Sequence, residues 1–395
     1  MVELSVEICG VKFKNPVMNA AGPLGYDGNT LIKVAKGGAG GLVTKTISVM
    51  PAKVPRPNMA LIDRGRLLSY MRISLDGRPI ELTKTSIKAT GGMLNVELWS
   101  DITFKQWIEK EISIAKTTGL PLIASLGYKA SDMRRMAKKI EKAGVDAIEF
   151  STHYVGVDPK PIVEVAKTLK ELVSIPVFAK LSPHTQEISS LAKAVEKAGI
   201  DGIVAINSFG PCLHIDVETG KPYLGGENGY GWISGPPIKP LAIRCVAEIA
   251  KAVKIPVIGV GGIASGNDIV EHIMAGASAV QVCTSAIIEG PSIFRRLVSE
   301  LEEYMKFHKY DSIEDFKGIA LKYLPKKPIR TKSIPPKIDI EKCKGCGLCV
   351  TSCVYEAIKV EKKPEMRSAK AFIDLKKCYG CGLCVSLCPT RALSF

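Results

Sequence analysis

Two stretches of sequence, KAGVDAIEF at residues 142–150 and KAGIDGIVA at residues 197–205, decide the fold. Each joins the end of a helix to the start of a strand, and Gly144 and Gly199 supply the left-handed residue that ends the helix. The helices are indicated by apolar residues at the spacing i, i+3, i+4, i+7, namely Met133, Met136, Ala137, Ile140 and Ile188, Leu191, Ala192, Val195. Helix and strand therefore alternate through this part of the chain.

The same alternation extends over residues 1–324, which contain eight short β-rich runs. These runs are Val17–Ala20, Gly41–Ile47, Pro121–Leu126, Ala147–Phe150, Val177–Leu181, Gly202–Ile206, Val257–Val260 and Ala279–Val282. Eight β/α units in about 300 residues predict an α/β fold of the (β/α)₈ TIM-barrel type, with its chemistry at the carboxyl ends of the strands. An open doubly wound sheet is the alternative, but no G-x-G-x-x-G opens the first helix.

Eight of the twelve cysteines lie between Cys343 and Cys388 and form two copies of C-x₂-C-x₂-C-x₃-C, offset by 35 residues. In this pattern the fourth cysteine of each copy ligates the cluster held by the other copy. The sequence therefore predicts two [4Fe–4S] clusters. One would be held by Cys343, Cys346, Cys349 and Cys388, and the other by Cys378, Cys381, Cys384 and Cys353.

Disulfides and zinc are the alternative uses of these cysteines. Disulfides are rare in the cytosol, and zinc sites usually take two pairs of ligands rather than triplets with a distant fourth. Residues 337–395 resemble the bacterial two-cluster ferredoxins, which implies a small α+β ferredoxin-like domain. One departure is that Val354 follows Cys353, whereas Pro389 follows Cys388 as that family requires. Residues 325–336 hold four prolines and predict an extended linker between the two domains.

Composition excludes several classes of protein. A hydrophobic share of 46% in 395 residues can build a sizeable core, so wholesale disorder is excluded. No apolar run approaches 18 residues, and the N-terminus lacks a basic-then-apolar signal, so we expect a cytoplasmic protein without a membrane span. The net charge of +15 is dispersed, without a basic stripe interleaved with aromatics, which disfavours nucleic acid as a partner.

Small and basic residues follow the predicted strands and suit a flat, anionic cofactor. Lysines inside apolar strands need an anion nearby, and the last two strand ends of a barrel are its usual phosphate site. FMN meets these demands. The predicted cofactor residues are Ala20, Ala21, Gly22, Lys45, Thr46, Lys180, Gly261, Gly262, Cys283, Thr284 and Ser285.

The chain also resembles the dihydroorotate dehydrogenase superfamily, and in particular the portion of dihydropyrimidine dehydrogenase that carries both FMN and two clusters. The resemblance rests on residues 15–22 (NPVMNAAG), 44–46 (TKT), 94–98 (LNVEL), 207–208 (NS), 261–262 (GG) and 282–285 (VCTS). It implies that Lys180 lies near the flavin N1/O2 edge, and that Lys45 contacts both the flavin and the substrate side. It further implies that Asn95, Asn207 and Ser208 hydrogen-bond a small pyrimidine-like substrate.

Residues 151–158, STHYVGVD, depart from that family. Ser151 stands where a substrate-orienting asparagine is usual, the loop is short, and the cysteine that acts as acid in dihydropyrimidine dehydrogenase is absent. We rank His153 first as a replacement acid and Tyr154 second, because histidine titrates nearest to neutral pH and both belong to the family's acid loop. Cys212 and His214 rank third. The sequence leaves the substrate open.

Two hypotheses for function follow. In the first, the chain is a redox enzyme that exchanges a hydride between FMN and a small heterocyclic or unsaturated substrate, and passes single electrons through the clusters. In the second, it is an electron-transfer subunit of a larger complex with little substrate chemistry of its own. No motif for NAD(P)H is visible, so we expect a ferredoxin or a separate NAD(P)H-flavoprotein subunit as redox partner. We also expect a homodimer or a hetero-oligomer.

Overall fold

The computed structural model describes residues 2–62, 91–151, 158–185, 187–325, 332–364 and 366–395. The chain forms two compact units, Met1–Tyr323 and Leu324–Phe395. No helix among the described residues is both long and apolar enough to cross a membrane.

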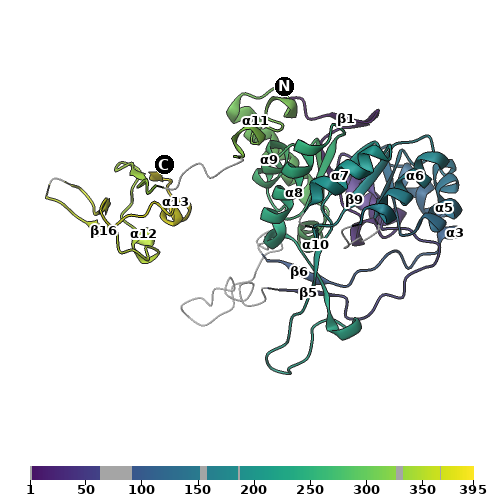
Figure 1. Cartoon of the computed structure of the whole chain (residues 1–395), viewed down its shortest axis with the longest axis horizontal. Coiled ribbons are helices and arrows are strands. Elements are labelled where there is room, and N and C mark those ends of the chain that lie inside the picture. Colours follow the sequence, from purple (N-terminus) through teal and green to yellow (C-terminus); the bar gives the residue numbers. More distant parts are fainter. Residues whose placement is uncertain (1, 63–90, 152–157, 186, 326–331, 365) are drawn as a thin grey trace. The chain divides into compact units, whose positions relative to one another are not determined.

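The first unit is built around an eight-stranded parallel sheet with the order β3-β14-β13-β10-β9-β8-β7-β4, surrounded by helices (Figure 1). Its strands are β3 (Val17–Asn19), β4 (Leu42–Val43), β7 (Leu122–Leu126), β8 (Ala147–Ser151), β9 (Val177–Leu181), β10 (Gly202–Ala205), β13 (Val257–Val260) and β14 (Ala279–Val282). Each lies within or next to one of the eight predicted runs. A parallel bridge between Met18 and Gly41 joins the two end strands of that order. The barrel prediction is therefore confirmed, and the open sheet is excluded.

Asn19 completes the closure between β3 and β4. Its buried side chain donates a hydrogen bond to the Val43 carbonyl at 2.7 Å and accepts one from the Val43 N–H at 3.0 Å. The amide thus takes the place of a backbone peptide in the ladder, which satisfies both polar groups of a buried residue. The barrel is closed by a side chain at the point where its strands are shortest.

Helices cover the outside of the barrel with their apolar faces inward. They are α1 (Gly28–Lys36), α3 (Phe104–Gln106), η2 (Trp107–Glu111), α4 (Ile112–Lys116), α5 (Ala130–Lys142), α6 (Lys160–Leu172), α7 (Ile188–Lys197), α8 (Lys239–Ala252), α9 (Gly266–Met274), α10 (Thr284–Glu289) and α11 (Ile293–His308). The predicted apolar faces of α5 and α7 are buried as expected. Gly144 and Gly199 follow these helices with φ of +91° and +90°, so the predicted helix ends are also confirmed.

A hairpin of β1 (Val6–Ile8) and β2 (Val11–Phe13) closes the amino ends of the strands. Ile8 and Phe13 are buried in the cluster that fills the barrel interior. The Cys9 thiol contacts the carbonyl of Asp201, just before β10, at 3.2 Å. With the amino ends plugged, the carboxyl ends are the side that is open for a site.

An antiparallel sheet with the order β11-β12-β6-β5 lies beside the barrel, and the sequence analysis did not predict it. Its strands are β5 (Met59–Leu61), β6 (Met93–Asn95), β11 (Phe209–Cys212) and β12 (Gly231–Ser234). They come from the segments that follow β4 and β10 (Figure 1). In β6, Asn95 pairs with Trp232 on one side and with Met59 on the other. This sheet therefore fixes Asn95, one of the predicted substrate residues.

The second unit repeats one small motif twice. It contains β15 (Lys337–Ile338), α12 (Leu348–Thr351), β16 (Ile358–Glu361), β17 (Lys370–Ile373), α13 (Leu383–Leu387) and β18 (Leu393–Ser394). The first strand of the unit pairs with the last, and the two middle strands pair with each other. Cysteines Cys343 and Cys384 belong to its small buried core. The small α+β architecture expected for this segment is confirmed.

Candidate functional site

One cavity lies at the carboxyl ends of the barrel strands and encloses about 1000 Å³, its open mouth included. Every predicted cofactor residue and every predicted substrate residue lines it: Ala20, Ala21, Gly22, Lys45, Thr46, Asn95, Ser151, Lys180, Asn207, Ser208, Gly261, Gly262, Cys283, Thr284 and Ser285. These residues come from segments scattered over most of the barrel's sequence. The fold thus brings the predicted residues together, while their individual roles stay predictions.

Lys180 enters the cavity from β9 and is held by two other strands. Its Nζ lies 3.2 Å from the carboxylate of Glu149 and 3.4 Å from the Gln281 side-chain oxygen. The Gln281 amide in turn donates to Glu149 at 2.7 Å. The Lys180 side chain is only 5% exposed and that of Glu149 is not exposed at all, so each charge needs the other. The cation is therefore fixed in one place at the cavity wall.

Glu149 is a functional candidate that the sequence analysis missed. The sequence did contain a signal, because an acidic residue in the middle of the apolar strand AIEFS is costly unless it is paired. The same argument applies to Lys180, a charged residue in the apolar strand VFAKL. The two charges lie on neighbouring strands β8 and β9, and their pairing became visible only when the strand order was known.

Lys45, which follows β4, pairs with a different acidic residue, Glu97. Its Nζ donates to the Glu97 carboxylate, which also accepts a hydrogen bond from the Asn58 amide. The side chain of Lys45 is 3% exposed and that of Glu97 is 11% exposed, so this ion pair is largely shielded from water. Glu97 lines the cavity and lies in the LNVEL segment, but the sequence analysis gave it no role. It is the second missed candidate.

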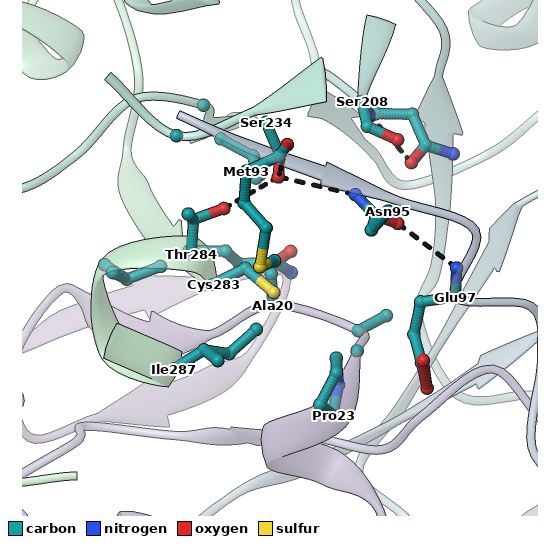
Figure 2. A pocket seen from close by; sticks show the side chains of 18 of the residues that line it. Ala20, Pro23, Met93, Asn95, Glu97, Ser208, Ser234, Cys283, Thr284 and Ile287 are labelled. Atoms are coloured by element: carbon teal, nitrogen blue, oxygen red, sulfur yellow. Dashed lines mark hydrogen bonds between the residues drawn. The ribbon is translucent and has the colours of Figure 1, made fainter. Parts of the chain in front are cut away.

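A chain of hydrogen bonds connects the two ends of the cavity. The Thr284 hydroxyl contacts the Ser234 hydroxyl at 2.8 Å, and the Asn95 amide donates to that hydroxyl at 3.5 Å. The Asn95 carbonyl oxygen accepts from the Glu97 backbone N–H at 3.3 Å. Figure 2 shows these groups along one wall, with Pro23 and Ile287 across the cavity. The orientation of the Asn95 amide is therefore set before any substrate binds.

Ser151, at the end of β8, is 3.0 Å from the amide of Asn207, which donates to its hydroxyl. The Asn207 carbonyl oxygen accepts from the Ser208 N–H at 3.0 Å. Both amide groups of Asn207 thus have partners within the protein. Ser151, the position where the resemblance leads one to expect an asparagine, thus offers Asn207 a hydroxyl.

The glycines after β13 line the cavity where a phosphate cradle is predicted. Gly261 and Gly262 have φ of +126° and +79°, and a Cβ on Gly262 would lie 2.4 Å from the Lys239 Cβ. Burial lowers the pKa of His272 to about 4, so its ring is neutral and Nε2–H donates to the Gly261 carbonyl at 3.1 Å. The Ser285 hydroxyl donates to the Ile263 carbonyl at 2.7 Å. These two carbonyls are thus satisfied within the protein, and the missing side chains of the glycines leave room there for a phosphate group.

The predicted acids are less well supported by the geometry. His153 and Tyr154 lie outside the described residues. Cys212 belongs to β11, where its thiol is 3.8 Å from the Phe209 carbonyl, and the His214 ring packs on Tyr223 with ring centroids 4.6 Å apart. Neither Cys212 nor His214 is among the described residues that line the cavity. Their assignment stays a prediction without support from the site geometry.

Two other acidic groups do line the cavity. Burial raises the pKa of the Cys283 thiol to about 11 and that of the Tyr128 hydroxyl to about 12. Both groups therefore hold their protons tightly near neutral pH and are poorly matched to proton transfer there. They do not replace the predicted acids.

The second unit contains two smaller cavities, each lined by four cysteines. One is lined by Cys343, Cys346, Cys349 and Cys388, and the other by Cys353, Cys378, Cys381 and Cys384. Backbone N–H groups of Ala392 and Ala357 point at the sulfurs of Cys388 and Cys353, at 3.2 and 3.3 Å. Each fourth cysteine thus joins the triplet of the other copy, the grouping expected from the spacing. Four thiolates around a small space, with N–H donors to sulfur, fit a [4Fe–4S] cluster.

These observations first define a class: a (β/α)₈ oxidoreductase barrel with a buried lysine at the carboxyl ends of its strands, in one chain with a two-cluster electron-transfer module. The family model described as "Dihydroorotate dehydrogenase" matches residues 3–305, and that described as "4Fe-4S dicluster domain" matches residues 342–392. The chain belongs to the dihydroorotate dehydrogenase family. It is an FMN- and iron–sulfur-dependent oxidoreductase of the kind that acts on CH–CH bonds.

Curated relatives carry the description "Dihydroorotate dehydrogenase B (NAD(+)), catalytic subunit". The protein of Thermoplasma acidophilum is 35% identical over 332 residues, which cover 82% of this chain and 100% of the relative. That of Methanothermobacter thermautotrophicus is 32% identical over 328 residues, covering 80% and 98%. That of Methanocaldococcus jannaschii is 33% identical over 330 residues, covering 80% and 98%. About a fifth of this chain has no counterpart in the alignment with these relatives.

Proposed function

We propose that this chain exchanges a hydride between FMN and a small cyclic amide of pyrimidine-like chemistry, and passes single electrons through two [4Fe–4S] clusters to or from a separate redox partner. FMN, when bound, supplies the conversion between a two-electron and a one-electron step. The proposal adds to the family assignment a class of substrate and a route for electrons. It leaves open the direction in which the electrons travel.

The observation that carries the proposal is the composition of one wall of the cavity. Asn95, Asn207 and the Lys45–Glu97 pair all line the cavity that Lys180 also lines. Amide side chains can donate and accept at once, which matches the alternating N–H and C=O groups of a cyclic amide. A module that only relays electrons has no use for such groups beside its flavin, so this wall favours an enzyme over the relay alternative.

Lys180 and Lys45 have separate tasks in this proposal. Lys180, fixed by Glu149 and Gln281, stabilises negative charge that develops on the cofactor side. Lys45, paired with Glu97, orients the substrate face. The proton that accompanies hydride transfer would be held by His153 or, in second place, Tyr154.

The relatives' printed names mention dihydroorotate, NAD(+) and a catalytic subunit. For this chain we propose dihydroorotate and dihydropyrimidines as the first compounds to test. A separate partner is proposed because the sequence shows no nucleotide-binding motif of its own, and either a ferredoxin or an NAD(P)H-flavoprotein subunit would serve. Whether the chain pairs with a copy of itself or with a different subunit is part of the same proposal.

The test is anaerobic mixing of the holoenzyme with dihydroorotate, dihydrouracil, dihydrothymine and related cyclic amides. One of these compounds should bleach the flavin, and its oxidised form should restore the flavin of the reduced enzyme. Asn95→Ala should lower the affinity for that compound, whereas Asn267→Ala, at an exposed position of α9, should leave it unchanged. If none reacts while electrons still pass between a protein partner and the flavin, the relay alternative is correct.

A further inference from the structure

The two cluster cavities are not equivalent, although they come from two copies of one motif. The residue after the first cysteine is Lys344 in the first copy and Tyr379 in the second. The second residue after the fourth cysteine is Thr390 at one cavity and Tyr355 at the other. One cavity therefore has a lysine and a threonine at its rim where the other has two tyrosines.

The two tyrosines form a single exposed surface. Their rings are stacked with centroids 4.5 Å apart and planes inclined by 23°. Tyr355 is 40% exposed and Tyr379 is 68% exposed, and next to them in sequence Val354 is 80% exposed. Leu375, in the turn before Cys378, is 70% exposed. We call these four residues the tyrosine rim.

Apolar side chains kept in water beside a redox site need an explanation. Two stacked aromatic rings bury part of each other, but most of the Tyr379 surface and nearly all of Val354 stay accessible. Exposed apolar patches on small proteins often mark interaction sites, and tyrosine is among the residues that dominate binding energy at interfaces. The two tyrosines of the rim line the cavity of Cys353, Cys378, Cys381 and Cys384, so a partner docked on them would be close to that cluster.

Charge indicates what kind of partner fits. Residues 324–395 contain 15 Lys and Arg against six Asp and Glu, a net charge of +9, although clusters with their thiolates remove part of it. Residues 1–323 carry the remaining +6 of the chain's net charge of +15. Their net charge has the same sign, so it is not complementary to that of the second unit. Lys376 and Lys377 are exposed between Leu375 and Cys378, with Glu356 and Asp374 as the acidic neighbours in sequence. Opposite net charge steers association and speeds it.

We infer that the tyrosine rim is the docking surface for an acidic one-electron carrier protein, and that electrons enter or leave the chain through the cluster held by Cys353, Cys378, Cys381 and Cys384. This rests on the electron exchange in the proposed function and names its partner surface. In each event the reduced carrier loses one electron and the cluster gains it, or the reverse. No bond is made or broken, and no further reductant is required.

The experiment uses the full holoenzyme and a small acidic [4Fe–4S] ferredoxin, reduced beforehand, as the probe. Anaerobic stopped-flow absorbance follows reduction of the clusters and, separately, of the flavin. The second-order rate should fall as salt is added, since screening weakens attraction between opposite charges. Tyr355→Ala/Tyr379→Ala should lower it by about tenfold or more, whereas Phe at both positions should preserve most of it.

Phe307→Ala is the control. Phe307 is an aromatic residue of α11 that is 82% exposed, so its truncation removes exposed aromatic surface outside the tyrosine rim and outside every cavity described above. It should leave the rate with the probe unchanged. Iron content and the rate with dithionite, a small inorganic reductant, should equal those of the parent in every variant. These two measurements separate lost docking from lost clusters.

Three outcomes would overturn the inference: a parent rate in the double Ala variant, an equal or larger loss in Phe307→Ala, or a rate that rises with salt. Slower exchange between clusters and flavin with a parent rate of cluster reduction would also overturn it, by assigning the rim to transfer within the chain. Failure of the proposed function looks different, because it is the absence of any substrate that bleaches the flavin, and that measurement needs no carrier.

Discussion

The two units of this protein assemble their sites in opposite ways. In the second unit, each cavity takes three cysteines from one run of seven residues and a single cysteine from the other copy. In the barrel, the contacts around Lys180 join residues far apart in the chain: Lys180 and Gln281 are separated by 101 positions, and Glu149 and Gln281 by 132. One site is nearly local, and the other exists only when the barrel closes.

This difference has a consequence for how the sites fail. A local site loses its metal group when one ligand is removed, because the remaining backbone cannot supply another thiolate. A site built from many strands spreads its contacts, so single changes weaken cofactor binding or slow a step without abolishing the fold. The following predictions use that contrast, from the largest expected effect to the smallest.

The strongest test concerns the crossed ligation of the second unit. Cys353→Ser and Cys388→Ser should each lower the iron content from about eight atoms to about four. Cys353→Ser/Cys378→Ser should lose no more iron than either single variant, because both cysteines belong to one cluster. Cys353→Ser/Cys343→Ser should lose both clusters. Iron analysis and Mössbauer spectroscopy of anaerobic protein decide this, and the reverse pattern of the two doubles would show uncrossed ligation.

The next prediction concerns the proton donor. It tests whether the barrel site depends on one short segment, residues 151–158, as the cluster sites depend on short runs of cysteines. His153→Ala should slow single-turnover flavin oxidation by the substrate about 10²- to 10⁴-fold, with FMN still bound, because a general acid is lost. Tyr154→Phe is the second choice. Cys212→Ala and His214→Ala test the third-ranked acids, for which we expect the smallest slowing because neither residue is among the described residues that line the cavity. Parent rates in all four variants would remove every acid predicted here.

Lys180→Ala tests the contacts among Lys180, Glu149 and Gln281, which come from three different strands. Loss of a charged donor should weaken FMN binding about tenfold or more, or leave the flavin harder to reduce. Glu149→Gln keeps the shape of the partner but removes its charge, so it should shift the flavin reduction potential while keeping the fold. Lys138→Ala, on the exposed face of α5, is the control for a lost lysine. Equilibrium dialysis and a redox titration suffice, and unchanged values for Lys180→Ala would place it outside the site.

Asn19→Ala addresses barrel closure and has the smallest expected effect. It leaves the N–H and C=O of Val43 without their side-chain partner, which should lower the free energy of unfolding by about 1–3 kcal/mol. The chain's tryptophans, Trp99, Trp107 and Trp232, all precede residue 324, so tryptophan fluorescence, excited selectively, reports on the first unit alone. Asn267→Ala, an exposed change on α9, should be nearly neutral. Equal unfolding of the two variants would contradict a closing role for Asn19.

The sequence supported the cluster cavities and the barrel strands well for a simple reason. Cysteine spacing and period-3.6 or strand-length apolar runs are local properties, and each was readable within a few dozen residues. All predicted cofactor and substrate residues line one cavity, because carboxyl ends of parallel barrel strands meet at one face and strand β6 brings Asn95 to the same cavity. The antiparallel sheet that holds Asn95 was missed, because its four strands are short and come from loops without clear alternation.

By itself, the sequence determined which residues are predicted to carry chemistry: the eight-cysteine repeat, the lysines inside apolar strands and the glycines after β13. Those choices follow from residue type and spacing, since a thiolate, a buried cation or a residue with positive φ is needed whatever surrounds it. Only the tertiary structure decided which side chains these residues contact. Glu149 reaches Lys180, Glu97 reaches Lys45, and Asn19 closes the barrel, because strand order brings distant segments within hydrogen-bond distance and no local pattern records that meeting.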